Sequence, residues 1–259
     1  MTIIHNSNDG IIEPFINRLL LKQCGLIQRV KIDMKSQGNR IILAGGSGSG
    51  KTTAAKLLLA KTCRHLSDSR LTILDYKHID FVFCEGGKNY YSFEDVDKGF
   101  IAFYEMFEYR LKHGLKASDP WEIIYMDEHQ NYLLSLPSTV KEKEAGGRLL
   151  DQKTFLSMFS RLMGLSRALK IHVILSVQKP MAELFGNQRE SANIKIGLGS
   201  LSPQSIQILF DEYKDRCSPQ PCGSGYFAKD DVNFTNILVS YPWAYEELIQ
   251  KDIFDAVNR

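Results

Sequence analysis

Short apolar runs alternate with longer helical patterns along most of this chain. Five runs have the aliphatic, β-branched composition of buried strands and are bounded by turn residues or charges. They are Arg40 to Ala44, Leu71 to Leu74, Ile123 to Met126, Ile171 to Val177 and Ile194 to Leu198. Strands that alternate with helices in this way are typical of βαβ units. We therefore predict an α/β fold with a mainly parallel central sheet flanked by helices on both faces.

Two longer segments have helical periodicity. The first ends at Gly114, and its apolar stripe consists of Phe100, Phe103, Tyr104, Phe107 and Leu111. The second, Phe155 to Leu169, leads directly into the fourth strand. The segment between them, Ser138 to Lys153, contains two adjacent glycines and has no apolar periodicity, so we expect a loop there.

The remaining pattern predicts the domain organisation. Residues 1–38 place Phe15, Ile16 and Leu19 roughly on one face, which predicts a helical approach segment before the sheet. The chain has 259 residues, of which 44% are hydrophobic, enough apolar material for one large core. Residues 39–259 are therefore expected to form a single domain.

Composition narrows the classes of function. Lysine and arginine total 32 against 30 aspartate and glutamate, so the net charge of +2 gives no global electrostatic reason to expect nucleic acid. The longest apolar runs are far shorter than the roughly 20 residues of a membrane helix, and the N-terminus lacks a signal-peptide pattern. The five cysteines lack the spacing of a zinc site. We expect a cytoplasmic protein with reduced thiols.

A complete phosphate-binding motif follows the first strand. It matches GxxxxGK[ST] between a strand and a helix, the context that the motif requires. Its residues, with the first residue that follows, are Gly45, Gly46, Ser47, Gly48, Ser49, Gly50, Lys51, Thr52 and Thr53. Glycines let backbone N–H groups point at phosphate oxygens, and the helix N-terminus adds the positive end of its dipole. We expect Lys51 to contact the β- and γ-phosphates of ATP and the Thr52 hydroxyl to ligate Mg²⁺.

The third apolar strand ends in two acids, Asp127 and Glu128. This is roughly where a P-loop fold places its metal-coordinating carboxylate, so we assign Asp127 to Mg²⁺. Hydrolysis also needs a carboxylate that orients or deprotonates the attacking water, and we assign that role to Glu128. An acidic helix start stabilised by the helix dipole would account for the charges, but not for their position after an apolar strand.

A polar residue, Gln178, ends the fourth strand. In P-loop ATPases that have an additional catalytic glutamate, this strand lies between the P-loop strand and the acidic strand. The tip of the strand then faces the γ-phosphate, and Gln178 is predicted to sense that phosphate as a catalytic residue. A glutamine before a Lys-Pro turn is by itself a common loop residue. The functional interpretation therefore depends on its position at the end of a strand that follows the P-loop strand and the acidic strand.

The stretch from Arg161 to Pro180, RLMGLSRALKIHVILSVQKP, resembles the motor domain of the FtsK/SpoIIIE DNA translocases within the HerA/FtsK superfamily. It is similar to the family's arginine-containing helix, its Ile-His strand and its Gln-Arg-Pro end. Asp75-Tyr76-Lys77 is similar to the family's Asp-Pro-Lys, and the matches extend over roughly Arg40 to Phe227. The resemblance implies a RecA-like P-loop ATPase motor domain in a short, stand-alone version.

The resemblance also implies roles for basic residues. Arg167 corresponds to an arginine finger inserted into the ATP site of a neighbouring subunit, although by itself it would be a solvated helix arginine, and Arg161 is the reserve candidate. The active form would be a ring, usually a hexamer, with double-stranded DNA in its pore. The segment Ser138 to Lys153 occupies the place of the pore loop and offers Lys141, Lys143, Arg148 and Lys153 as phosphate contacts. Because acids are interspersed, a solvated surface loop is an equal alternative.

These observations predict an ATP-driven DNA translocase that hydrolyses ATP to ADP and phosphate. Its small size suits a mobile element, in a conjugative coupling or packaging role with a possible membrane or secretion-channel partner. The alternative from another class is a protein-export ATPase similar to type VII secretion motors, which moves polypeptide. A small-molecule kinase is less favoured because Glu128 and Gln178 suit the activation of water.

Overall fold

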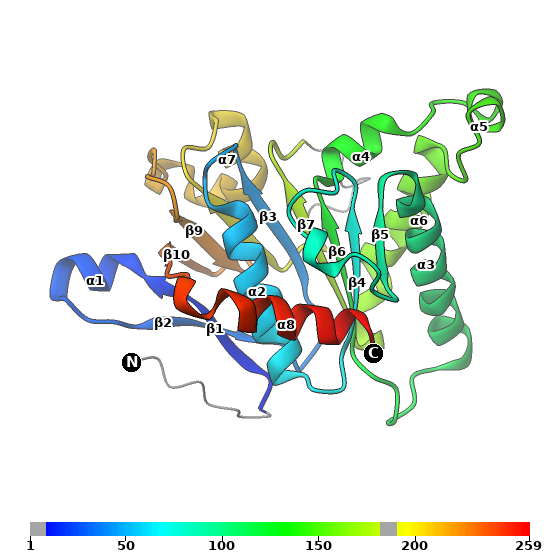
Figure 1. Cartoon of the computed structure of the whole chain (residues 1–259). Coiled ribbons are helices and arrows are strands. Elements are labelled where there is room, and N and C mark those ends of the chain that lie inside the picture. Colours follow the sequence, from blue (N-terminus) through cyan, green and yellow to red (C-terminus); the bar gives the residue numbers. More distant parts are fainter. Residues whose placement is uncertain (1–8, 182–190) are drawn as a thin grey trace.

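A ten-stranded mixed sheet forms the centre of the computed structural model, which describes residues 9–181 and 191–259 (Figure 1). The strand order in these residues is β2-β1-β10-β9-β8-β3-β7-β6-β4-β5. The strands are β1 Ile11–Asn17, β2 Arg29–Asp33, β3 Arg40–Gly45, β4 Arg70–Asp75, β5 Tyr90–Ser92, β6 Glu122–Asp127, β7 Ile171–Val177, β8 Ile194–Leu198, β9 Ser224–Lys229 and β10 Asn233–Val239.

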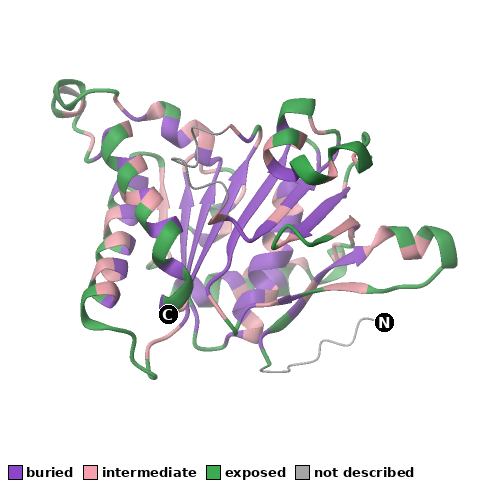
Figure 2. Cartoon of the chain, turned by 180° about the vertical axis from the view of Figure 1, so that it is seen from behind, coloured by how far each residue is buried: buried purple, intermediate pink, exposed green. Residues whose placement is uncertain are grey.

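The parallel half of the sheet contains all five predicted strands. β7 lies between the P-loop strand β3 and the acidic strand β6, and β8 and β4 flank this trio. The predicted bounds agree with the observed ones to within one residue at each end. Helices cover both faces of this half of the sheet, and its strands are buried on both sides (Figure 2). This is why each of these strands is a continuous apolar run in the sequence. Their carboxyl ends meet at one edge of the sheet.

The antiparallel half corrects the expectation for residues 1–38. β9 pairs with β8, and β10, β1 and β2 follow in antiparallel pairing. Only α1, Arg18–Cys24, is helical in the described part of this segment. The register between β1 and β2 shifts between Ile12 and Phe15, around Pro14. The irregularity breaks the strict alternation of buried positions in β1. As a result, the spacing of Phe15, Ile16 and Leu19 resembles the spacing of apolar residues on one face of a helix.

Helices lie on both faces of the sheet (Figure 1). Besides α1, they are α2 Lys51–His65, α3 Val96–His113, α4 His129–Ser135, α5 Val140–Gly146, α6 Gln152–Leu165, α7 Pro203–Phe210 and α8 Glu246–Val257. α2 and α8 pack together over one hydrophobic cluster, and α3, α6 and α7 cover a second cluster on the other face. None of the helices formed by residues 9–181 and 191–259 is both long and apolar enough to cross a membrane.

The two predicted helices are present. α3 carries the aromatic stripe and ends at Gly114, as expected. α6 and the 3₁₀ turn Ser166–Leu169 that follows it span the second predicted helix. Phe100 of α3 packs against Phe155 of α6, with ring centroids 4.6 Å apart, so the two helices form one layer on the sheet.

The segment from Ser138 to Lys153 is not simply a loop, because it contains α5. Thr139 accepts a hydrogen bond from the Glu142 backbone, and the Glu142 side chain accepts one from the Thr139 backbone, at 3.2 and 3.3 Å. This capping box satisfies exposed donors at the helix start. Val140 is exposed, so the helix does not depend on an apolar stripe that the sequence pattern would reveal.

Candidate functional site

The P-loop joins the end of β3 to the start of α2. Gly48 and Gly50 have φ angles of 72° and 90°, which favour glycine. A Cβ added at Gly46 or Gly48 would have no neighbour within 4 Å, so there is open space beside these two glycines. No side chain caps the start of α2 at Gly50, and the Ser49 hydroxyl is buried with no hydrogen-bond partner among the described residues. Such a turn at a helix N-terminus fits a phosphate group.

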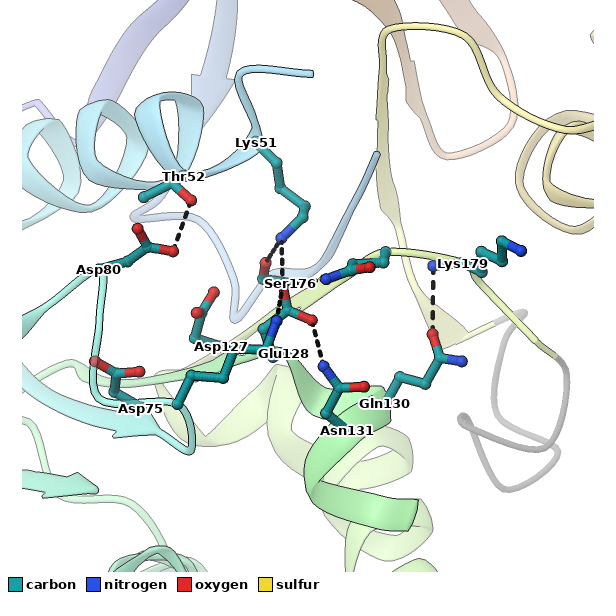
Figure 3. A network of polar contacts seen from close by, with 12 residues as sticks. Lys51, Thr52, Asp75, Asp80, Asp127, Glu128, Gln130, Asn131, Ser176 and Lys179 are labelled. Atoms are coloured by element: carbon teal, nitrogen blue, oxygen red, sulfur yellow. Dashed lines mark hydrogen bonds and ion pairs between the residues drawn. The ribbon is translucent and has the colours of Figure 1, made fainter. Parts of the chain in front are cut away.

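Lys51 connects the P-loop to the tips of two neighbouring strands (Figure 3). Its Nζ lies 3.0 Å from the Ser176 Oγ on β7 and 3.4 Å from Oε1 of Glu128, just past β6. The Lys51 and Glu128 side chains are both only 7% exposed. When a phosphate enters the site, the Lys51 ammonium can exchange its contacts with this carboxylate and hydroxyl for contacts with phosphate oxygens.

Glu128 is the centre of the polar network. Its Oε1 accepts a hydrogen bond from Gln178 Nε2 at 2.9 Å and lies 3.3 Å from Lys77 Nζ, while Oε2 accepts one from Asn131 at 2.9 Å. Burial raises the pKa of Glu128, but the Gln178 hydrogen bond and the charges of Lys51 and Lys77 outweigh it and hold the pKa below its usual value. The carboxylate is thus ionised at neutral pH.

The backbone of Glu128 is strained. Its φ of 50° is in the left-handed region, which costs a residue with a Cβ on the order of 1 kcal/mol or more. The residue lies at the junction between the end of β6 and the first turn of α4. The turn directs the carboxylate back toward the P-loop (Figure 3).

Oxygen ligands suitable for Mg²⁺ gather beside the network. Asp127 is 2% exposed and accepts a hydrogen bond from the Tyr125 hydroxyl at 2.8 Å, and burial raises its pKa to about 6. The Thr52 hydroxyl donates to Asp80 Oδ2 at 3.0 Å. Carboxylate and hydroxyl oxygens are the hard ligands that Mg²⁺ prefers, so these residues fit the ion. Asp127 and Thr52 would hold it, with Asp80 holding the Thr52 hydroxyl.

Four residues of the network had no assigned role in the sequence: Lys77, which was only part of a match to the family, Ser176, Asn131 and Asp80. Ser176 is part of an apolar strand, and Asn131 lies one helical turn after Glu128, a signal that periodicity could have provided. Asp80 follows a turn that the sequence does not position. Asp75, by contrast, has a structural role, because its carboxylate accepts hydrogen bonds from the backbone of His78 and from the Tyr90 hydroxyl.

Arg167 does not lie at this edge of the sheet. It belongs to the 3₁₀ turn that precedes β7, whereas the P-loop follows the parallel strand β3, so the two lie at opposite edges. The Arg167 side chain is exposed and hydrogen-bonds Gln37. Arg161, also exposed, pairs with Glu108 at 2.6 Å. Arg167 and Arg161 both lie away from the P-loop of their own chain.

The proposed DNA contacts separate into two groups. Lys141 and Lys153 are exposed and Lys143 is partly exposed. Arg148 instead turns inward, and its guanidinium donates two hydrogen bonds to the buried carboxylate of Asp97, at 2.7 and 3.1 Å. Its charge is therefore already neutralised within the protein.

No protein-family model and no curated protein matches the sequence, but solved structures match the fold. The pCW3 conjugation coupling protein TcpA, in a monomer form with ATPγS, has a TM-score of 0.72 and 19% identity over 95% of this chain and 70% of its own. ATPases 2 and 3 of the Thermomonospora curvata type VII secretion ATPase EccC, with a signal sequence peptide, have a TM-score of 0.68 and 14% identity over 99% of this chain and 49% of theirs.

A third similar structure is the genome-packaging NTPase B204 of Sulfolobus turreted icosahedral virus 2 with AMPPCP. Its TM-score is 0.50, with 10% identity over 77% of this chain and 96% of its own. These structural neighbours are P-loop ATPases of the FtsK/HerA type. The RecA-like P-loop fold that the sequence resemblance implied is confirmed.

Proposed function

We propose that this chain is an Mg²⁺-dependent ATPase that uses hydrolysis to move DNA, as the coupling or packaging motor of a mobile element. The observation that carries the ATPase assignment is the convergence of Lys51, Gln178 and Lys77 on one oxygen of Glu128. The P-loop, the end of β6 and the end of β7 thus meet around a single carboxylate. A purely structural glycine turn would need none of these contacts.

The protein groups divide the reaction between them. The P-loop N–H groups and Lys51 bind the β- and γ-phosphates, and Lys51 exchanges its contact with Glu128 for phosphate oxygens. Mg²⁺ held by Thr52 and Asp127 would neutralise charge on those oxygens. Glu128 accepts the proton of the water whose oxygen bonds to the γ-phosphorus, while the bond to the β-phosphate oxygen breaks and ADP leaves. Gln178 orients the carboxylate.

Action in a ring is part of the proposal. Arg167 lies at the sheet edge opposite the P-loop of its own chain, so a role in hydrolysis requires a neighbouring subunit. A head-to-tail ring places the surface of one subunit against the ATP edge of the next. A guanidinium inserted there stabilises charge in the transition state. We propose a homo-oligomer, with a hexamer as the expected closed state.

DNA is the substrate that we favour over polypeptide. Among the similar structures reported above, the conjugation coupling protein has a higher TM-score than the secretion ATPase, and a genome-packaging NTPase also matches. Lys141, Lys143 and Lys153 leave at least part of their side chains open to solvent and supply candidate phosphate contacts. The secretion ATPase supports the alternative, a motor that moves polypeptide.

The test is the ATPase rate with and without duplex DNA at several salt concentrations. Stimulation that decays as salt rises supports phosphate contacts, because counterion release is salt-dependent. Lys141→Ala combined with Lys143→Ala should weaken the stimulation and its salt dependence, whereas Lys112→Ala, at an exposed position on α3, should change neither. ATP hydrolysis that no length of DNA stimulates would favour the export function.

A further inference from the structure

A projecting arm of the chain is joined to the body at a narrow base. The arm comprises residues 136–150, and α5 at its end stands away from the helices that cover the sheet (Figure 1). Leu136 and Leu150 are buried at its two ends. The Gln152 backbone donates to Pro137 O at 3.0 Å, and its side chain donates to Leu136 O at 3.1 Å. The two ends of the arm are thus held together.

The buried carboxylate of Asp97, on α3, fixes the returning end of this arm. Asp97 is 1% exposed. It accepts hydrogen bonds from the backbone N–H groups of Leu149 and Leu150 at 3.0 and 3.3 Å, in addition to the two from Arg148. Its hydrogen bonds also raise the pKa of the Arg148 guanidinium. A desolvated carboxylate with this many donors holds the backbone of the arm in one position.

The same carboxylate holds the helix that follows the catalytic glutamate. Tyr132 of α4 donates its hydroxyl proton to Asp97 Oδ1 at 2.8 Å, and Arg148 lies over the Tyr132 ring, 5.9 Å from its centroid. Burial and the Asp97 charge raise the pKa of Tyr132 far above its usual value, so the hydroxyl remains a donor. α4 and the arm therefore share one buried anchor.

α4 in turn begins at the active site. The Tyr132 backbone donates to Glu128 O at 3.2 Å, and the neighbouring Asn131 side chain donates to Glu128 Oε2 at 2.9 Å. A displacement of α4 would therefore move the Asn131 amide relative to the carboxylate that activates water. The path from the arm to this carboxylate consists of Asp97, Tyr132 and one turn of helix.

We propose that Asp97 is a positioning residue that couples the arm to Glu128 through Tyr132, so that nucleotide in the P-loop and a partner on the arm each change the geometry of the other. The role of Glu128 in hydrolysis comes from the proposed function. Coupling of two sites through one shared element is reciprocal, so it can be measured from the nucleotide side with no polymer present.

The test is hydrogen–deuterium exchange of the Leu149 and Leu150 amides in the whole chain, with and without a non-hydrolysable ATP analogue and Mg²⁺. We expect the analogue to change their exchange rates by about fivefold or more in the unmodified protein. Tyr132→Phe removes only the hydroxyl and should abolish that change while retaining affinity for the analogue. Arg148→Lys is the second variant, for use if Tyr132→Phe does not fold. It keeps the charge but loses the paired hydrogen bonds to Asp97, so it should reduce the change in exchange rate.

Glu108→Gln is the matched control. Glu108 also lies on α3 and pairs with an arginine, but that pair is exposed and joins α6 rather than α4. This variant should respond to the analogue like the unmodified protein. The proposal is overturned if the unmodified protein shows no response at Leu149 and Leu150, or if Tyr132→Phe responds as strongly as Glu108→Gln.

The response of the ATPase rate to DNA distinguishes a failure of the proposed substrate from a failure of the proposed coupling. If DNA stimulates hydrolysis, Tyr132→Phe should lose most of that stimulation and Glu108→Gln should keep it. If DNA has no effect but the analogue still changes exchange at Leu149 through Tyr132, the proposed substrate is wrong and the coupling stands. If DNA stimulates both variants equally, the coupling is wrong and the proposed substrate stands.

Discussion

Gln178 and Glu128 are joined by a hydrogen bond of 2.9 Å between the ends of two neighbouring parallel strands. The donor is the side-chain amide at the tip of β7, and the acceptor is the carboxylate just beyond β6. The bond both orients the carboxylate and stabilises its ionised form. A polar residue at the tip of the strand between the P-loop strand and the acidic strand thereby holds the carboxylate to which the proposed function assigns the activation of water.

This relationship predicts a pH effect for Gln178→Ala. Loss of a donor to the ionised carboxylate makes protonation of Glu128 easier, so its pKa rises. The acid limb of the profile of kcat against pH should therefore move to higher pH. At neutral pH, kcat should fall because the carboxylate loses the hydrogen bond that orients it, while the affinity for ATP changes little. Gln207→Ala, at an exposed position on α7, is the control and should leave the profile unchanged. An acid limb that stays in place would remove Gln178 from the catalytic network.

Glu128→Gln and Lys51→Ala should separate hydrolysis from binding. Loss of a general base reduces turnover by about 10²- to 10⁴-fold, so Glu128→Gln should retain ATP and turn it over very slowly. Lys51→Ala removes the cation that contacts the phosphates and should weaken binding itself. Fluorescent-nucleotide titration and a phosphate-release assay measure the two effects. Normal turnover by Glu128→Gln would show that another group accepts the proton.

Asp127→Asn should stabilise the folded protein at alkaline pH in the absence of Mg²⁺. The folded state raises the pKa of Asp127 from 3.8 to about 6, so it binds the proton more tightly than the unfolded state does. The resulting stability is fully present below pH 3.8 and is lost as pH rises through about 6. A neutral asparagine avoids the cost of a buried charge, about 3 kcal/mol at pH 8.

Urea unfolding at pH 8 and at pH 4.5 measures this difference. Asp127→Asn should exceed the unmodified protein in free energy of unfolding at pH 8, and the advantage should shrink at pH 4.5. Glu122, whose pKa burial raises to about 7, is present in both proteins and cancels from the comparison. The same variant should lose Mg²⁺-dependent ATPase activity. An equal free-energy difference at both pH values would contradict the buried-charge argument.

Much of the sheet edge at the P-loop could be predicted from the sequence, because a recognisable motif lies there beside the ends of buried parallel strands. Lys51 is fixed by a motif, and Glu128 and Gln178 follow apolar strands whose order is limited by the right-handed βαβ rule. Strands buried on both faces also give runs that are easy to recognise. The structure brings these three side chains together as expected.

Other features depend on contacts between distant residues. The antiparallel strands β1, β2 and β10 contain exposed or half-buried positions, and the irregularity around Pro14 disguises β1. Asp80 reaches Thr52 only because the turn after β4 folds back over the start of α2. Arg148 has the composition of a phosphate contact, yet its partner, Asp97, lies 51 residues earlier in the chain. Residue type alone could not separate Arg148 from the lysines nearby.

Arg167 provides the sharpest prediction for the proposed ring. Since it lies at the edge opposite the P-loop, Arg167→Ala should leave ATP binding intact and reduce hydrolysis in the assembly, by about 10³-fold if it acts as an arginine finger. Arg167→Ala and Glu128→Gln subunits are each inactive in a ring of their own kind. In an equal mixture, about a quarter of the interfaces would join the intact Glu128 of one subunit to the intact Arg167 of its neighbour.

A mixture of the two inactive variants should therefore recover activity. Lys51→Ala mixed with Glu128→Gln is the matched control, because both lesions affect the same side of the interface and no combination restores a complete site. Arg161→Ala, which removes the other exposed arginine of this region, should remain active alone if Arg167 is the finger. Assembly is verified by particle mass with nucleotide and DNA. Mixed rings of the expected mass that stay inactive would exclude the action of Arg167 in trans.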